Sequence, residues 1–92
     1  MTDYSYSEFK QDLPDLWEVD FRIDRQGFHY ERDYISRDGT WRFWLAGPKG
    51  ALVFDEVVDS QDGMVETVLG LKVCEGNTIA ELWDRLEITN MV

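Results

Sequence analysis

The chain carries one histidine and one cysteine, the side chains that most often supply a general base and a nucleophile. His29 would need an orienting partner and a nearby nucleophile to act as a base. Glu31 lies on the same face of the expected strand, but no serine or cysteine is close to His29 in the sequence. Cys74 has only Lys72 as a basic neighbour in the sequence. We therefore expect a surface or packing histidine, and a cysteine that acts as a small buried apolar residue.

The spacing of the other residues does not indicate a metal, phosphate or catalytic site. Residues 59–63 (Asp-Ser-Gln-Asp-Gly) are similar to the start of a calcium loop, but the alternating ligands are missing and the twelfth position is Gly70. The chain contains no glycine-rich phosphate loop and no nucleophile–base–acid triad. Paired carboxylates occur in any acidic chain, so their spacing does not identify a glycosidase. The sequence therefore predicts a protein that is not an enzyme, with no catalytic, cofactor-binding or metal-ligating residue.

Acidity is the strongest chemical feature of the chain. Its 92 residues include 19 Asp and Glu against 9 Lys and Arg, which gives a formal net charge of −10. A field of this sign repels nucleic acid and anionic membranes and attracts basic protein surfaces. No basic residue lies between Lys49 and Lys72, and this gap contains the carboxylates of Asp55, Glu56, Asp59, Asp62 and Glu66. A second acidic cluster follows the charged face of the first expected strand and includes Glu18 and Asp20.

The two acidic clusters lead to a hypothesis about the partner. Carboxylates on one face of a strand repeat about every 6.6 Å, a spacing able to imitate a run of backbone phosphates. We therefore expect a protein-binding module whose partner is a basic protein surface. One such partner is the nucleic-acid-binding site of a host protein that a phage or mobile element inhibits. Direct nucleic-acid binding is not expected, because the arginines of the first half are interleaved with acids.

Two alternatives to charge-based binding stay open. The first is a housekeeping or immunity-type interaction domain that uses an aromatic surface, and the second is acidity that serves only solubility. The surroundings of Trp44 distinguish an aromatic surface from charge-based binding, because Trp44 lies on the opposite strand face from Trp41 and Phe43. An exposed Trp44 within an apolar patch would favour the aromatic surface, whereas a continuous acidic band would favour mimicry. The sequence also leaves a homodimer open.

Composition indicates one folded domain, residues 1–92, in the cytoplasm. Apolar residues make up 43% of the chain and aromatic residues 14%, which is enough for a core and too much for a solvated acidic tail. A lone thiol favours a reducing compartment. The first residues form no signal peptide, and no apolar run reaches the roughly 20 residues of a membrane span, so we expect no membrane partner. Since no cofactor-binding motif is present, we also expect no cofactor.

Periodicity and capping signals predict an α+β fold, a four-stranded antiparallel meander with a short N-terminal helix and two C-terminal helices packed on one face. The expected helices are 5–13, 60–69 with Gly70 as its C-terminal cap, and 78–86, and Ser5/Glu8 and Thr78/Glu81 have capping-box spacing. The expected strands are 17–23, 28–35, 41–45 and 51–58. The expected turns are Arg25-Gln26-Gly27, Asp38-Gly39, Gly47-Pro48-Lys49-Gly50 and Gly76-Asn77. Residues 87–92 either add an edge strand or fray.

The same alternation predicts the core. Trp17, Phe21, Trp41 and Phe43 should line the side of the sheet that faces the helices, with Trp83 packed against them. Arg32 interrupts the pattern, because it shares a face with Phe28 and Tyr30. Either Arg32 lies at the margin of the sheet, or a bulge near residues 32–33 shifts the register.

The C-terminal segment reads Gly76-Asn77-Thr78-Ile79-Ala80-Glu81-Leu82-Trp83-Asp84, and Leu86-Glu87-Ile88 follows. It resembles the ending "G-x-T-[IL]-x-E-[IL]-W-D" and "[IL]-E-[IV]" of small uncharacterised proteins of Gram-positive bacteria and their mobile elements. The resemblance implies an α+β domain. It carries no known activity, so it transfers no functional residue to this chain.

Overall fold

The structure is a computed structural model that describes residues 4–35 and 40–92. Its α-helices are α1 (Tyr6–Asp12), α2 (Gln61–Gly70) and α3 (Ile79–Leu82). Single 3₁₀ turns are η1 (Leu13–Asp15), η2 (Pro48–Gly50) and η3 (Trp83–Arg85). The strands are β1 (Glu18–Ile23), β2 (Gln26–Ile35), β3 (Thr40–Ala46), β4 (Leu52–Val58) and β5 (Leu86–Met91). The predicted Asp38-Gly39 turn lies outside the described residues.

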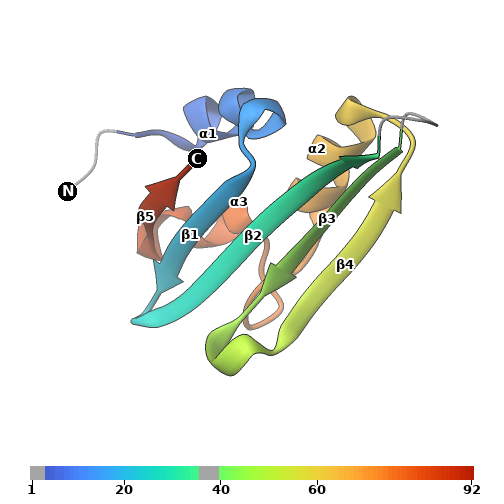
Figure 1. The fold of residues 1–92 in the computed structure, drawn as a ribbon. Coiled ribbons are helices and arrows are strands. Elements are labelled where there is room, and N and C mark those ends of the chain that lie inside the picture. The colour runs from blue at the N-terminus through green and yellow to red at the C-terminus, as the bar shows by residue number, and fades with distance from the viewer. Residues whose placement is uncertain (1–3, 36–39) are drawn as a thin grey trace.

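The strands form one antiparallel sheet in the order β4-β3-β2-β1-β5 (Figure 1). The α+β class is as predicted, but the strand number is wrong, because the sheet has five strands and not four. The additional strand is the C-terminal tail, which pairs with β1. Leu86 and Ile88 pack against the core while Glu87 is exposed, so this segment has the period of a half-buried strand. The backbone of Val92 continues the pairing with hydrogen bonds to Trp17 and Glu18.

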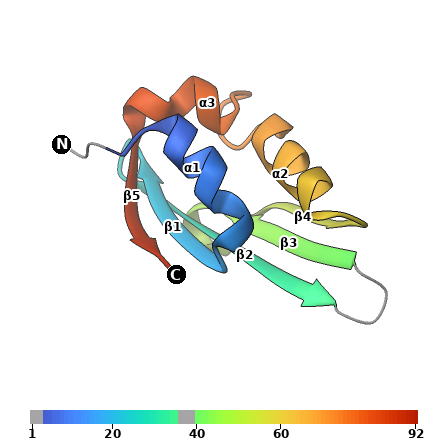
Figure 2. The ribbon, with the colours of Figure 1, turned by 90° about the horizontal axis from the view of Figure 1, so that it is seen from above.

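The helices lie together on one side of the sheet (Figure 2). Both predicted capping boxes are present, at Ser5/Glu8 before α1 and at Thr78/Glu81 before α3. The C-terminal helix is shorter than predicted. It ends at Leu82, and after η3 the chain enters β5 at Leu86, because Leu86 and Ile88 must reach the edge of the sheet beside β1.

Two predicted turn and cap residues have other positions. The β1–β2 turn is not at residues 25–27 but at Asp24 and Arg25, whose φ angles are 50° and 72°. Ile23 and Gln26 pair on either side, so this is a two-residue hairpin turn that needs positive φ at both positions. Gly70 is the last residue of α2 and not a left-handed cap, because the chain leaves the helix through Leu71 in an extended conformation.

Arg32 lies in the central strand β2, opposite Phe43 of β3 and just beyond the end of β1, on the face that packs against the helices. The pairings of β2 with β1 and with β3 have no register shift, so no bulge is present near residues 32–33. The Arg32 guanidinium is sandwiched between the rings of Trp17 and Trp41, 4.3 and 4.7 Å from their centroids. Its Nε–H donates to the Leu16 carbonyl oxygen at 2.8 Å, which offsets the cost of burying the charge.

The core lies between the helices and the sheet. Phe21 and Phe43 are buried as predicted, together with the side chains of Phe9, Leu13, Val19, Ile23, Phe28, Tyr30, Leu45, Phe54, Met64, Val68, Val73, Ile79 and Leu82. Trp41 is partly buried against them. Trp17 is not part of the core as predicted: it lies before β1, its ring covers Arg32, and it is 50% exposed. The Trp83 ring contacts Tyr4, Tyr6 and Phe9, so it joins α1 to the C-terminal segment.

We expect Phe21→Ala to lower the free energy of unfolding by about 3–5 kcal/mol, because it removes a fully packed ring. Phe21 is 3% exposed, and its ring stacks on that of Phe28 with centroids 5.2 Å apart. Urea denaturation measures the change, with Val57→Ala at an exposed strand position as the control. A loss below about 1 kcal/mol would show that Phe21 is not part of the core.

A substitution at Gly63 tests the hydrogen bond by which Ser60 caps the N-terminus of α2. The Gly63 N–H donates to the Ser60 Oγ at 3.0 Å, and a Cβ added at Gly63 would lie 2.8 Å from that oxygen. Alanine in a helix is usually about 0.5–1 kcal/mol more favourable than glycine, but here it must displace the capping hydroxyl. In the wild type, we expect Gly63→Ala to leave the free energy of unfolding no higher than before. In a Ser60→Ala background, we expect the same substitution to raise it by about 0.5–1 kcal/mol. Equal effects in both backgrounds would contradict this coupling.

Candidate functional site

The side of the sheet opposite the helices is the first candidate surface, and we call it the open face (Figure 1). Its side chains alternate along each strand with the buried ones. They are Glu18, Asp20 and Arg22 of β1, His29, Glu31 and Asp33 of β2, Arg42, Trp44 and Ala46 of β3, Leu52, Asp55 and Val57 of β4, and Glu87 and Asn90 of β5.

Four of these side chains form a compact cluster over β1 and β2. The hairpin register places Glu18 opposite Glu31 and Asp20 opposite His29. The Nδ1 of His29 lies 2.5 Å from an Asp20 oxygen, and its Nε2 lies 2.8 Å from a Glu31 oxygen. These side chains are about one-third exposed, so water still reaches the cluster.

The cluster favours the charged form of His29. Each ring nitrogen faces a carboxylate oxygen, and both nitrogens can donate only in the imidazolium form. The hydrogen bond to Asp20, and then that to Glu31, raises the pKa of His29 above its ordinary value, against the smaller opposing effect of burial. When His29 is protonated, the open face therefore carries a positive charge among its carboxylates.

The cluster also has the composition of a metal site, which the sequence did not predict. One ligand atom each from Glu18, His29 and Glu31 lie within 4.8 Å of one another. His29 and Glu31 were recognised as sharing a strand face, but Glu18 joins them only through the pairing of β1 with β2. The predicted turn at residues 25–27 would pair β1 and β2 in a different register. A turn at Asp24 and Arg25 is the sequence feature that would have placed Glu18 opposite Glu31.

A row of residues in register crosses four strands and begins with two members of this cluster. It runs from Glu18 through Glu31 and Trp44 to Asp55. Arg42 donates two hydrogen bonds to Asp55, at 3.0 and 2.7 Å, and this pairing lowers the pKa of Asp55. The same guanidinium lies 5.5 Å from the centroid of the Trp44 ring. Trp44 is therefore partly buried, with charged residues as its partners in both neighbouring strands and a guanidinium over its ring.

A shallow hollow of about 430 Å³ lies on the open face next to His29. Small residues make room for it, among them Gly27, Ala46 and Gly47. Its polar lining comes from Asp20, Arg22, His29 and Thr89. The hollow is therefore continuous with the cluster and large enough for one side chain of a partner.

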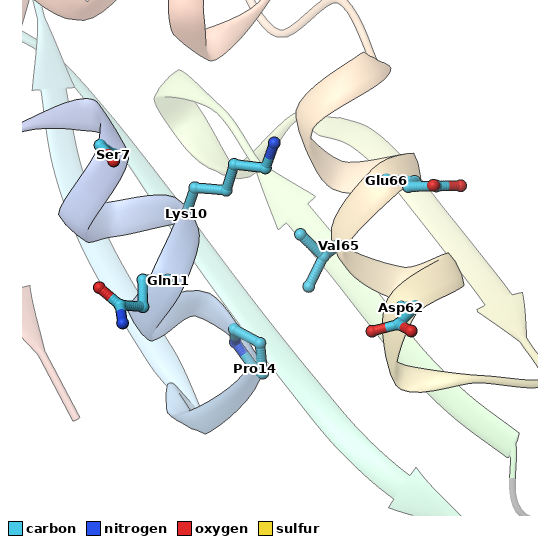
Figure 3. Close-up of a pocket in the computed structure, with 7 residues that line it drawn as sticks. All are labelled: Ser7, Lys10, Gln11, Pro14, Asp62, Val65 and Glu66. Carbon is cyan, nitrogen blue, oxygen red and sulfur yellow. The ribbon is translucent and has the colours of Figure 1, made fainter.

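A second depression, a groove of about 570 Å³, lies between α1 and α2 on the other side of the molecule (Figure 3). Lys10 extends from α1 into the space between the two helices, with Val65 of α2 facing it (Figure 3). Asp62 and Glu66 belong to the α2 wall. The groove is open and lined mainly by flexible surface side chains, so nothing in it fixes the position of a ligand.

The predicted acidic residues do not form one surface. Asp55 lies on the open face, as Glu18, Asp20 and Trp44 do. Asp62 and Glu66 line the groove on the helix side of the molecule. Glu56 is on the edge strand β4 and pairs with Phe43, so it alternates away from the open face, and Asp59 lies in the bend that follows. The run that is continuous in sequence is divided because β4 and α2 belong to different layers.

Cys74 is partly buried beside a turn at Glu75 and Gly76, one residue before the predicted Gly76-Asn77 turn, and its backbone pairs with that of Asn77 across this turn. Burial, followed by the charge of Glu75, raises the pKa of the thiol. The sulfur therefore stays protonated near neutral pH, as a weak nucleophile.

The state of His29 makes the stability of the protein depend on pH. Because the folded-state pKa is raised above 6.5, its contacts stabilise the fold fully below pH 6.5, and this contribution is lost as the pH rises through the folded-state pKa. We expect the free energy of unfolding of the wild type, relative to His29→Gln, to decrease from about pH 6 to about pH 8. Urea denaturation with a chelator present measures this difference. A difference that is constant or increases with pH would contradict it.

The described helices include none that is long and apolar enough to span a membrane. Comparison of the chain with protein-family models, with curated proteins and with solved structures finds no match. Its function is therefore inferred from the open face, the cluster and the groove described above.

Proposed function

We propose that this protein is a non-enzymatic binding module, and that its open face binds a basic surface of a partner protein. The observation that carries the proposal is the separation of the two faces of the sheet. The helices cover one face, while the other presents charged side chains on paired strands whose backbone is held in a ladder. A pre-ordered surface loses little conformational entropy when a partner binds.

The charge of the open face supports a basic partner. Its guanidinium groups are those of Arg22 and Arg42, and the second of these is occupied by Asp55. Its carboxylates are more numerous and are those of Glu18, Asp20, Glu31, Asp33, Asp55 and Glu87. Such an excess accelerates association with a positively charged surface and disfavours anionic partners.

Internal pairing determines which carboxylates are available to that partner. Asp20 and Glu31 are engaged by His29, and Asp55 by Arg42. An uninterrupted imitation of backbone phosphates along one strand is therefore less favoured than a charged patch that crosses the strands. A basic nucleic-acid-binding site on a host protein still fits a patch of this kind, and the hollow beside His29 offers space for one of its lysine or arginine side chains.

Binding through an aromatic surface is the second candidate, and the surroundings of Trp44 disfavour it. Glu31 and Asp55 flank Trp44 in the neighbouring strands, and Arg42 lies over its ring. The indole therefore belongs to the charged patch and contributes contact area within it.

The test uses charge reversal on each side of the molecule. Glu18→Lys with Asp33→Lys changes the open face and leaves the His29 contacts in place, whereas Asp62→Lys with Glu66→Lys makes the same change of net charge in the groove. We expect proteins captured from host lysate by the wild type to be retained by the groove variant and lost by the open-face variant. Capture should weaken as salt rises from about 0.05 to 0.3 M. Circular dichroism checks that both variants fold.

Two results would contradict the proposal. Equal loss of capture in both double variants would show a dependence on net charge without a defined surface. Capture that survives reversal of Glu18 and Asp33 but is abolished by Trp44→Ala would assign binding to the aromatic side chain. Elution of the captured protein by duplex DNA would identify its nucleic-acid-binding site as the contact.

A further inference from the structure

We infer that Glu18, His29 and Glu31 form a binding site for a divalent transition-metal ion such as Zn²⁺ on the open face. Among the residues that the structure describes, these three side chains lie close enough together to bind one metal ion. This site does not require the proposed partner, because its three ligands all belong to the β1–β2 hairpin.

The spacing of the ligand atoms is suitable for a metal ion. They lie within 4.8 Å of one another. Ligands bound to Zn²⁺ at about 2.0–2.2 Å are roughly 3.3 Å apart, so small side-chain rotations bring them to this distance. Glu18 and Glu31 are direct cross-strand partners, and His29 precedes Glu31 by two positions on the same face. Paired strands thus hold all three ligands on a rigid scaffold.

The orientation of His29 assigns a role to each ring nitrogen. Nε2 lies 2.8 Å from the Glu31 oxygen, so it is the nitrogen that faces the carboxylates of the site. Nδ1 lies 2.5 Å from Asp20 on the other side of the ring. A carboxylate on the far nitrogen is the usual partner of a metal-bound histidine, because it fixes the ring and raises its basicity. When the ion binds, Nε2 releases its proton to solvent and its lone pair forms the bond to the metal. The Nδ1–H keeps its proton and continues to donate its hydrogen bond to Asp20.

Asp20 is therefore a positioning residue and not a ligand. It is held in place in turn, since the Asn90 side chain approaches its second oxygen at 3.5 Å, and the Thr89 hydroxyl donates to its backbone carbonyl at 3.2 Å. The strand β5 thus supports the orientation of His29 through Asp20.

The donor set favours particular ions. One imidazole and two carboxylates suit Zn²⁺, Co²⁺ and their neighbours, whereas Mg²⁺ and Ca²⁺ prefer oxygen ligands alone. The carboxylates neutralise the charge of a divalent ion. Because the side chains of His29 and Glu31 are 38% and 31% exposed, the remaining coordination positions are open to water.

Isothermal titration of the chelator-treated protein with ZnCl₂ near pH 7 tests the site, and Co²⁺ absorption reports the ligand field. Glu18→Gln, Glu31→Gln and His29→Gln each remove one ligand with little change of shape. Glu87→Gln is the matched control, because Glu87 is on the same face but lies opposite Arg22. We expect one Zn²⁺ per chain, affinity at least about tenfold weaker in each ligand variant, and an unchanged affinity in the control.

Asp20→Asn separates positioning from ligation. Because the three ligands remain, we expect Zn²⁺ affinity to fall by about 10–100-fold while the Co²⁺ spectrum at saturation keeps the bands of the wild type. A Co²⁺ spectrum altered as strongly as that of Glu31→Gln would make Asp20 a ligand and overturn the assignment.

Three results would overturn the site itself. The first is that the wild type binds no Zn²⁺ up to about 1 mM. The second is that His29→Gln binds Zn²⁺ as tightly as the wild type, and the third is that Mg²⁺ competes with Zn²⁺ for the wild type on equal terms. The last two would show general attraction of cations to an acidic face. None of these measurements involves a partner protein, so their failure is distinguishable from failure of the proposed function.

Discussion

The two-residue turn at Asp24 and Arg25 sets the register of β1 and β2, and the cluster on the open face depends on that register. Neither residue is glycine, and each left-handed residue costs about 1–2 kcal/mol. A surface ion pair supports the turn, because the Arg85 guanidinium of η3 binds the Asp24 carboxylate and also lies 3.5 Å from Glu75. A residue near the end of the chain thus stabilises the turn that brings Glu18 opposite Glu31.

The alternation of β1–β3 keeps the two faces chemically distinct, with Arg32 as the exception on the apolar side. This side chain is 6% exposed, and burial lowers its pKa. Two tryptophans and the Leu16 carbonyl surround the guanidinium and stabilise its charge, and the negative charge of Asp15 also favours the charged form. Trp17 remains half exposed because its ring covers this charge just beyond the end of β1. The large aromatic side chains near β1 therefore do not all serve the apolar core.

Local signals in the sequence predicted the parts of the fold that local interactions determine. The capping boxes at Ser5 and Thr78 need only residues within one helical turn, and both are present. The hairpin turn could not be predicted in the same way, and the sequence left open whether residues 87–92 add an edge strand or fray. Asp24 adopts its turn conformation with help from Arg85, and Leu86 joins the sheet through pairing with Ile23. The cluster was missed for the same reason, since Glu18 and His29 are brought together by pairing and not by spacing.

His29 makes the charge of the open face adjustable. When it is protonated between Asp20 and Glu31, it adds a positive charge where the carboxylates are densest. A metal ion bound at Nε2 would replace one proton and add one further positive charge, so it would reduce the attraction of the face for a basic protein. A basic partner contacting Glu18 would in turn disfavour metal binding there. By linkage the two effects must be equal in free energy, so the metal and the partner would be mutual antagonists. The same carboxylates cannot serve both at full strength, and the occupancy of the cluster would determine how strongly this face attracts a partner.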